Sequence, residues 1–145
     1  MNVIACLDLP ALPLQLVWRH EPTWRAHPVV VIDEDRPQGT VLWACERARS
    51  AGVLAGQRYA HALSLCRELR ARVVPPEQIT VAIEEVRTAL HRLSPRVEPA
   101  DEPGTFWLDG AGLERIFTDP EGTPRGTAWG LAIAQAAGTL ALRGA

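Results

Sequence analysis

Carboxylates near the ends of predicted strands are the residues with the clearest potential for chemistry. Asp8 follows an apolar run of five residues, and Asp101 and Glu102 lie inside the stretch Val97–Gly110, which Asp109 almost closes. Carboxylates from neighbouring strands can hold Mg²⁺, which clamps a triphosphate and activates an attacking hydroxyl. The alternative is that Asp8 caps a turn and the acidic pair is a solvated part of a hairpin. Spacing alone favours this second interpretation.

Arginine supplies all fifteen of the Lys and Arg residues, so lysine-based catalysis is excluded. Arg47, Arg49 and Arg58 can contact phosphate oxygens, because a guanidinium is a forked donor that matches them. A solvated helix face that also carries Glu46 is the favoured interpretation of the same residues. The net charge of -2 and the pI of about 6.1 do not indicate a nucleic-acid-binding protein overall.

The sequence predicts neither a zinc site nor a disulfide framework. The four His residues lack metal-ligand spacing, and Cys6, Cys45 and Cys66 form no C-x-x-C pair. The five Trp residues are interpreted as core and turn anchors. No apolar segment is long enough to cross a bilayer, and the expected location is the cytoplasm.

Strands and helices alternate along the chain, which predicts an α/β (α+β) sheet protein. Its length is that of a single domain or of a core with an added small lobe. The strands are expected at 3–7, 28–32, 40–43, 73–74, on both sides of a hairpin in 97–110, and at 139–143. The helices are expected at 45–51, 59–69, 79–93, 113–117 and 127–137. Because the chain stops inside its last predicted strand, we expect it to be a piece of a longer protein.

The order of these elements resembles the Y-family (DinB/UmuC-like) translesion DNA polymerases over nearly the whole chain. The matching stretches are Ile4–Pro10 (opening strand and D-x-D motif), Glu46–Val53 (Y-x-A-R-x-x-G-V helix), Ala62–Cys66, Val73–Pro75, Val97–Pro99 with Trp107–Gly110 (E-P-x-S-x-D-E-x-x-x-D hairpin) and Leu113–Phe117. The resemblance implies a palm-like sheet with helices and a small fingers-like subdomain. Residues 1–10 and 77–145 would be palm-like, truncated at the last strand, and 11–76 fingers-like.

Departures from the family pattern fall on its chemistry. Asp8 matches the first family acid, while Pro10 replaces the second, where the family ligates metal mainly through the backbone. Pro13 stands where the family has the aromatic residue that excludes ribonucleotides. Glu46 replaces the Tyr that contacts the triphosphate, although its partner Arg49 is retained.

The two hairpin carboxylates of the family are also replaced. Counting forward from the Glu98–Pro99 pair puts them at Pro103 and Gly104; counting back from Leu108–Asp109 puts them at Gly104 and Thr105. A single carboxylate cannot hold two Mg²⁺ ions against their hydration shells.

Asp101 and Glu102 lie two or three positions before the family acids, so a slipped hairpin can in principle return them to the site. An odd shift turns side chains to the wrong face of the sheet. Asp101 and Glu102 are therefore interpreted as vestigial, together with Asp8, which is the one metal-ligand candidate. Arg49 is a vestigial nucleotide contact in this interpretation.

This pattern resembles the ImuB branch of the family, in which the catalytic acids are degenerate; the opening Leu7–Leu14, with two prolines, is similar to that branch. The resemblance implies a non-catalytic, polymerase-like scaffold without a cofactor in translesion repair and induced (SOS) mutagenesis. Its expected partners are a RecA-like subunit, the sliding clamp and an error-prone polymerase, mainly through regions beyond Ala145.

Two other functions stay open. The first is an active, Mg²⁺-dependent DNA nucleotidyltransferase with a rearranged acidic site. The second is a module that binds DNA weakly through backbone contacts, which the low pI and the lack of Lys disfavour. Metal and nucleotide binding distinguish the scaffold from the enzyme, and a salt-dependent gel shift tests the DNA-binding module.

Overall fold

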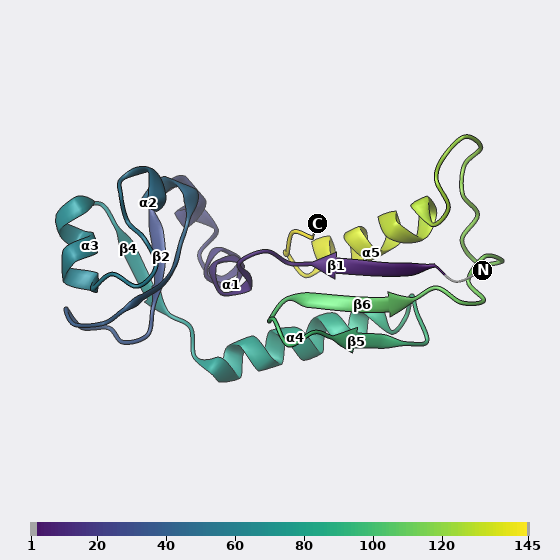
Figure 1. Cartoon of the computed structure of the whole chain (residues 1–145), viewed down its shortest axis with the longest axis horizontal. Helices are drawn as coiled ribbons and strands as arrows, with labels where there is room; N and C mark the ends of the chain where they lie inside the picture. The colour runs from purple at the N-terminus through teal and green to yellow at the C-terminus, as the bar shows by residue number, and fades with distance from the viewer. Residues whose placement is uncertain (1–2, 145) are drawn as a thin grey trace. The chain divides into compact units, whose positions relative to one another are not determined.

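The computed structural model describes residues 3–144, which form two compact units, each with its own three-stranded sheet (Figure 1). One unit runs through Pro10 and resumes at Thr80; we call it the split unit. The other, Ala11–Ile79, lies between these two segments in the sequence and is called the inserted unit. This mixed α/β arrangement confirms the predicted fold class.

The sheet of the split unit contains β1 (Ile4–Asp8), β5 (Val97–Pro99) and β6 (Thr105–Asp109). Its order is β1-β6-β5, and both pairings are antiparallel. Leu7 and Leu108 are buried while their neighbours along the strands are more exposed. Because side chains alternate across a strand, one face of this sheet belongs to the core and the other is open.

Two helices supply the rest of the split unit's core. α4 (Pro76–Leu90) begins in the last residues of the inserted unit, and α5 (Thr127–Thr139) lies along β1 (Figure 1). Each buries residues spaced four apart, which is the stripe of an amphipathic helix. The buried residues are Ala82, Val86 and Leu90 in α4, and Trp129, Ile133 and Ala137 in α5.

The strand predicted at 139–143 is wrong. Ala141 has a φ of 58°, and its N–H donates to Gly138 O at 3.0 Å, while the Leu142 N–H donates to Ala137 O at 3.1 Å. This pair of bonds is a Schellman turn, which ends a helix by satisfying its last carbonyls. Leu142 is buried. The apolar residues that suggested a strand are the end and the cap of α5.

The sheet of the inserted unit contains β2 (Val29–Ile32), β3 (Val41–Ala44) and β4 (Arg70–Val73). Its order is β3-β2-β4, with β2 antiparallel to β3 and parallel to β4. All four residues of β2 are buried. The helical segments of this unit are α1 (Leu12–His20), η1 (Pro22–Ala26), α2 (Glu46–Ser50) and α3 (Tyr59–Leu65).

The edge strand β4 begins earlier than the predicted strand at 73–74. Its N-terminal part contains Arg70 and Arg72, which the apolar pattern did not mark, because an edge strand tolerates polar side chains. Both guanidinium groups lie over the Trp24 ring, at 5.5 and 5.0 Å from its centroid. The Arg72 Nη2 also lies 3.0 Å from Glu21 Oε1. These contacts connect β4 to η1.

Two predicted helices have clearly different bounds, and a third does not form. α3 ends at Leu65 rather than at 69, because the chain must turn before β4. α4 occupies Pro76–Leu90 rather than 79–93, with Pro76 in its first turn, where the missing N–H costs no hydrogen bond. At 113–117 both Ile116 and Phe117 donate to Leu113 O, which makes one turn and not a helix. Within residues 3–144, no helix has the length and hydrophobicity required to span a bilayer.

Candidate functional site

Asp8 lies at the end of β1, directly opposite Thr105 at the start of β6. The Thr105 hydroxyl donates a hydrogen bond to Asp8 Oδ1 at 3.1 Å, and the Asp8 side chain is half-buried. One residue further on, the Leu9 N–H donates to Gly104 O at 2.8 Å. The position opposite Asp8 is thus occupied by a hydroxyl, and the backbone beside it is fixed by a hydrogen bond.

The hairpin loop between β5 and β6 carries the acidic pair noticed in the sequence. It is closed by bonds from Ala100 N–H to Thr105 O and from Thr105 N–H to Glu102 O. Asp101 and Glu102 are exposed, and Gly104 has a φ of 102°, a conformation that side-chain-bearing residues rarely adopt. Across residues 3–144, no group of three or more His, Cys, Asp or Glu side chains is arranged to hold a metal ion.

The donor set around Asp8 does not fit a pair of Mg²⁺ ions. Mg²⁺ is held through carboxylates and phosphates in near-octahedral oxygen geometry. Asp8 offers one carboxylate, and the neutral Thr105 hydroxyl already donates to it. The residues at this site therefore support no two-metal step.

The arginines considered for phosphate contact lie in the inserted unit. Arg47 and Arg49 are exposed on α2, which begins at the exposed Glu46. Arg58 Nη1 donates to Gln38 O at 2.8 Å, so part of its donor capacity serves the fold. Asp8 belongs to the split unit and Arg49 to the inserted unit.

The open face of the split-unit sheet carries three rows of side chains across its strands. The antiparallel register and the hydrogen bond from Asp109 N–H to Arg96 O define them. The rows are Ile4–Asp109–Arg96, Cys6–Trp107–Glu98 and Asp8–Thr105. Ile4 is 68% exposed and Trp107 49% exposed, and Cys6 is a free, exposed thiol. Apolar and acidic side chains are therefore interleaved on this face.

A shallow pocket of about 260 Å³ lies on the open face. Its lining residues include Ile4, Arg96, Glu98, Trp107 and Asp109. The exposure of Trp107, and the 43% exposure of Trp43 in β3, correct the prediction that all Trp residues are core or turn anchors. Alternation along β6 is the signal that could have placed Trp107 on the open side, since Phe106 and Leu108 on either side of it are buried.

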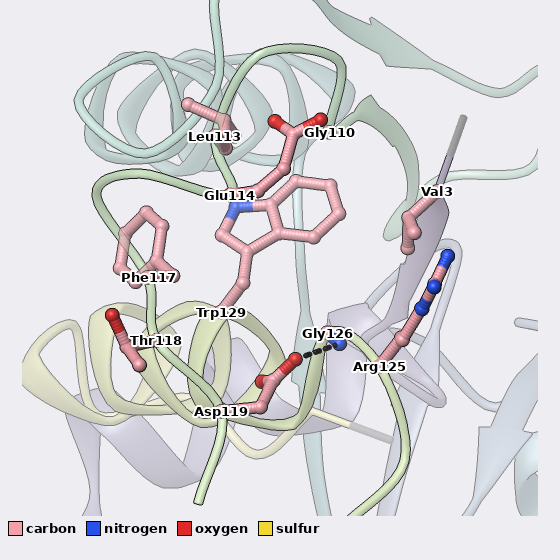
Figure 2. A pocket seen from close by; sticks show the side chains of 10 residues that line it. All are labelled: Val3, Gly110, Leu113, Glu114, Phe117, Thr118, Asp119, Arg125, Gly126 and Trp129. Carbon is pink, nitrogen blue, oxygen red and sulfur yellow. Dashed lines mark hydrogen bonds between the residues drawn. The ribbon is translucent and has the colours of Figure 1, made fainter. Parts of the chain in front are cut away.

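A larger pocket, of about 410 Å³, lies at the other end of β1 (Figure 2). The Trp129 ring stands between Leu113, Phe117 and Val3, and its Nε1 donates to Leu93 O at 2.9 Å. Val3 precedes β1 and Asp8 ends it, so roughly 16 Å of extended chain separates the two. This pocket is therefore separate from the candidate acid.

Asp119, on the rim of this pocket, caps the N-terminus of α5. Its carboxylate accepts the N–H of Ala128 at 2.9 Å and that of Gly126 at 2.8 Å, the second of which is drawn in Figure 2. These bonds, the Ala128 bond first, lower the pKa of Asp119 below its usual range because they favour the ionised form. The helix N-terminus is thus already satisfied from within the chain.

Comparison with known protein families identifies the chain's relatives. The sequence profile of the impB/mucB/samB (IMS) family matches residues 7–139. DNA polymerase IV 1 of Mesorhizobium japonicum is 34% identical over 119 residues, which cover 81% of this chain and 26% of that protein. The chain thus spans about a quarter of the length of this curated relative.

Comparison with solved structures gives the same fold. The insertion ternary complex of Dbh DNA polymerase superposes with a TM-score of 0.76 at 20% identity, covering 99% of this chain and 41% of that one. DinB from Sulfolobus solfataricus gives a TM-score of 0.75 at 20% identity, with 99% and 40% covered. At this identity the likeness concerns the fold, and the chain spans about two fifths of these structures.

Proposed function

The chain belongs to the impB/mucB/samB family, and on that premise we propose that it is a non-catalytic, polymerase-like scaffold in DNA damage tolerance. The resemblance to the N-terminal region of Y-family polymerases, drawn first from sequence motifs, is confirmed by the family match and the shared fold. In this proposal the split unit is the palm-like part and the inserted unit the fingers-like part. The fingers-like part was predicted to span residues 11–76, and the inserted unit spans Ala11–Ile79.

The observation that carries the proposal is the pairing of Asp8 with Thr105. Counting back along β6 assigned the family's second hairpin acid to Thr105, and the register sets Thr105 directly opposite Asp8. A hydroxyl there cannot neutralise a second cation, and Gly104 beside it supplies only backbone. The remaining carboxylate is too little for two-metal phosphoryl transfer.

The competing proposal is an active, Mg²⁺-dependent nucleotidyltransferase in which Asp101 or Glu102 replaces the family acids. Both side chains are exposed in the hairpin loop, and the hydrogen bond from Thr105 N–H to Glu102 O holds that loop in its register. The scaffold is preferred because this competitor requires the hairpin to slip. In the proposed scaffold, Arg49 is a vestigial contact to a nucleotide.

The scaffold acts through partners, for which the proposal names a RecA-like subunit, the sliding clamp and an error-prone polymerase. DNA would add weak backbone contacts. SOS-linked mutagenesis of the ImuB type is the proposed setting. The chain covers about a quarter of its curated relative. These partners and this setting are therefore proposals that go beyond the family relationship itself.

Calorimetric titration with Mn²⁺, with and without a deoxynucleoside triphosphate, tests this proposal. The wild-type chain and Asp8→Ala are both expected to bind neither ligand more tightly than about 1 mM. Thr105→Glu is the matched positive control, because it sets a second carboxylate opposite Asp8 and is expected to raise Mn²⁺ affinity about tenfold. Metal-dependent triphosphate binding by the wild type, lost in Asp8→Ala or Glu102→Ala, would establish the enzyme instead.

A further inference from the structure

The open face of the split-unit sheet has the character of an interaction surface. It exposes Ile4, Cys6 and Trp107 on two adjacent strands, whereas Leu7, Phe106 and Leu108 occupy the buried face. An antiparallel sheet commonly leaves one face to solvent, but the residues on such a face are usually polar. Adjacent large apolar side chains on an exposed face mark a site where another surface packs.

The charge of this face selects the class of partner. Three carboxylates, those of Asp8, Glu98 and Asp109, accompany one guanidinium, that of Arg96, which gives the face a formal charge of -2. Nucleic-acid binding depends on neutralising phosphates with Lys or Arg, so this face repels a phosphodiester backbone. A protein segment with Arg or Lys beside apolar residues complements it.

The dimensions of the face match a helix. Three strands at about 4.8 Å spacing offer a strip roughly 10 Å wide, which is close to the diameter of an α-helix with its side chains. The apolar residues lie in neighbouring rows of β1 and β6, and the shallow pocket beside Ile4 and Trp107 can receive one large side chain. The acidic residues surround these apolar positions.

We propose that the open face docks a basic amphipathic helix of a partner protein. The apolar stripe of the helix packs on Ile4, Cys6 and Trp107, and its Arg or Lys side chains face Glu98 and Asp109. This inference rests on the proposed scaffold function and specifies the surface that such a scaffold uses. The face that presents a metal-ligating acid in the family pattern becomes, in this chain, a protein-binding face.

Fluorescence anisotropy with labelled helical peptides tests the inference on the full chain. Three peptides of about 18 residues, roughly 27 Å long, share one apolar stripe and carry basic, neutral or acidic flanks. The basic peptide is expected to bind about tenfold more tightly than the neutral one, and the acidic one most weakly, with the difference shrinking at high salt. The double charge reversal Glu98→Arg with Asp109→Arg is expected to invert this order.

Single substitutions locate the binding site. Trp107→Ser and Ile4→Ser are each expected to weaken the basic peptide by about tenfold. Val81→Ser is the matched control, because Val81 is 58% exposed on α4 and lies outside the open face; it is expected to change nothing. Circular dichroism verifies that each variant is folded, and Trp107→Phe serves if Trp107→Ser is not, with a smaller expected loss.

Several outcomes overturn the inference: no peptide binding below about 1 mM, equal binding of all three peptides, or full affinity in folded Trp107 variants. Binding of a single-stranded oligonucleotide that requires Trp107 would assign the face to nucleic acid instead. The Mn²⁺ and triphosphate titration on the same preparation separates the two proposals. A negative titration with no peptide binding rejects only the docking face, whereas a positive titration rejects the scaffold itself.

Discussion

The two sheets of this chain bury their strands in opposite ways. In the inserted unit, every side chain of the central strand β2 is buried. In the split unit, β6 alternates, with Phe106 and Leu108 buried and Trp107 half-exposed. A strand buried on both faces tolerates few substitutions, whereas the exposed residues of a half-open sheet can change at little cost in stability. Asp8 and Thr105 pair on that open face, where side chains can be substituted without disturbing the core.

The largest expected effect comes from placing a charge in β2. Val31 is 1% exposed, and Val31→Asp buries an unpaired carboxylate between two packed layers. We expect a loss of at least about 4 kcal/mol in the free energy of unfolding, enough to unfold the inserted unit. Urea denaturation followed by circular dichroism measures it. A variant that unfolds cooperatively with the same urea midpoint as the wild type would show that β2 is not buried on both faces.

Neighbouring residues of β6 test the alternation within the split unit. Phe106→Ala removes a side chain with 0% exposure and is expected to cost about 3–5 kcal/mol. Trp107→Ala, one residue away and 49% exposed, is expected to cost less than about 1 kcal/mol. The comparison uses urea midpoints of both variants. Equal losses would contradict a sheet with one buried and one open face.

The edge of the inserted sheet depends on a smaller contact. Arg72 lies over Trp24 and pairs with Glu21, but both charged side chains are more than a third exposed, so solvent weakens the ion pair. Arg72→Ala is expected to cost about 1 kcal/mol, from lost cation–π contact and packing. Thermal unfolding measures the change, with the exposed Arg67→Ala as control. Equal melting temperatures for the two variants would remove any stabilising role of this cluster.

The smallest expected effect concerns the helix beside β1. The pKa of Asp119 is lowered in the folded state by the N–H groups of Ala128 and Gly126, so its stabilising contribution is present above the unfolded pKa of about 3.9. That contribution is lost as the pH falls through the lower, folded-state pKa. We expect Asp119→Asn to lower the melting temperature slightly at pH 7 and to lose less stability than the wild type between about pH 5 and 2. If the melting temperatures of the wild type and Asp119→Asn fell equally over this pH range, the capping role of Asp119 would be contradicted.

Much of the fold follows from periodicity in the sequence. The apolar runs predicted β1, the antiparallel pair β2 and β3, and the buried stripe of α4, because burial dictates those residues directly. The first residues of strand β4, which include two Arg, were not predicted as strand. Their place beside β2 depends on a tertiary contact between distant segments. The end of α5 was mistaken for a strand, since a short apolar run fits either element until its hydrogen bonds are known.

The candidate site was predictable in part. The motif at Ile4–Pro10 marked Asp8, but sequence counting left two positions open for each missing hairpin acid. Only the pairing of β1 with β6 shows that Thr105 faces Asp8. The exposed Trp107 was missed because a tryptophan in an apolar run is usually buried, and the open face is visible only once the strands are aligned.

Gly104 restricts which residues the hairpin loop can carry at that position. A substitution that introduced a carboxylate at position 104 would place it on backbone with a φ of 102°, at a conformational cost of about 1–2 kcal/mol. Position 104 is therefore a costly place for any side chain, whereas position 105, which lies opposite Asp8 in the adjacent strand, already carries one.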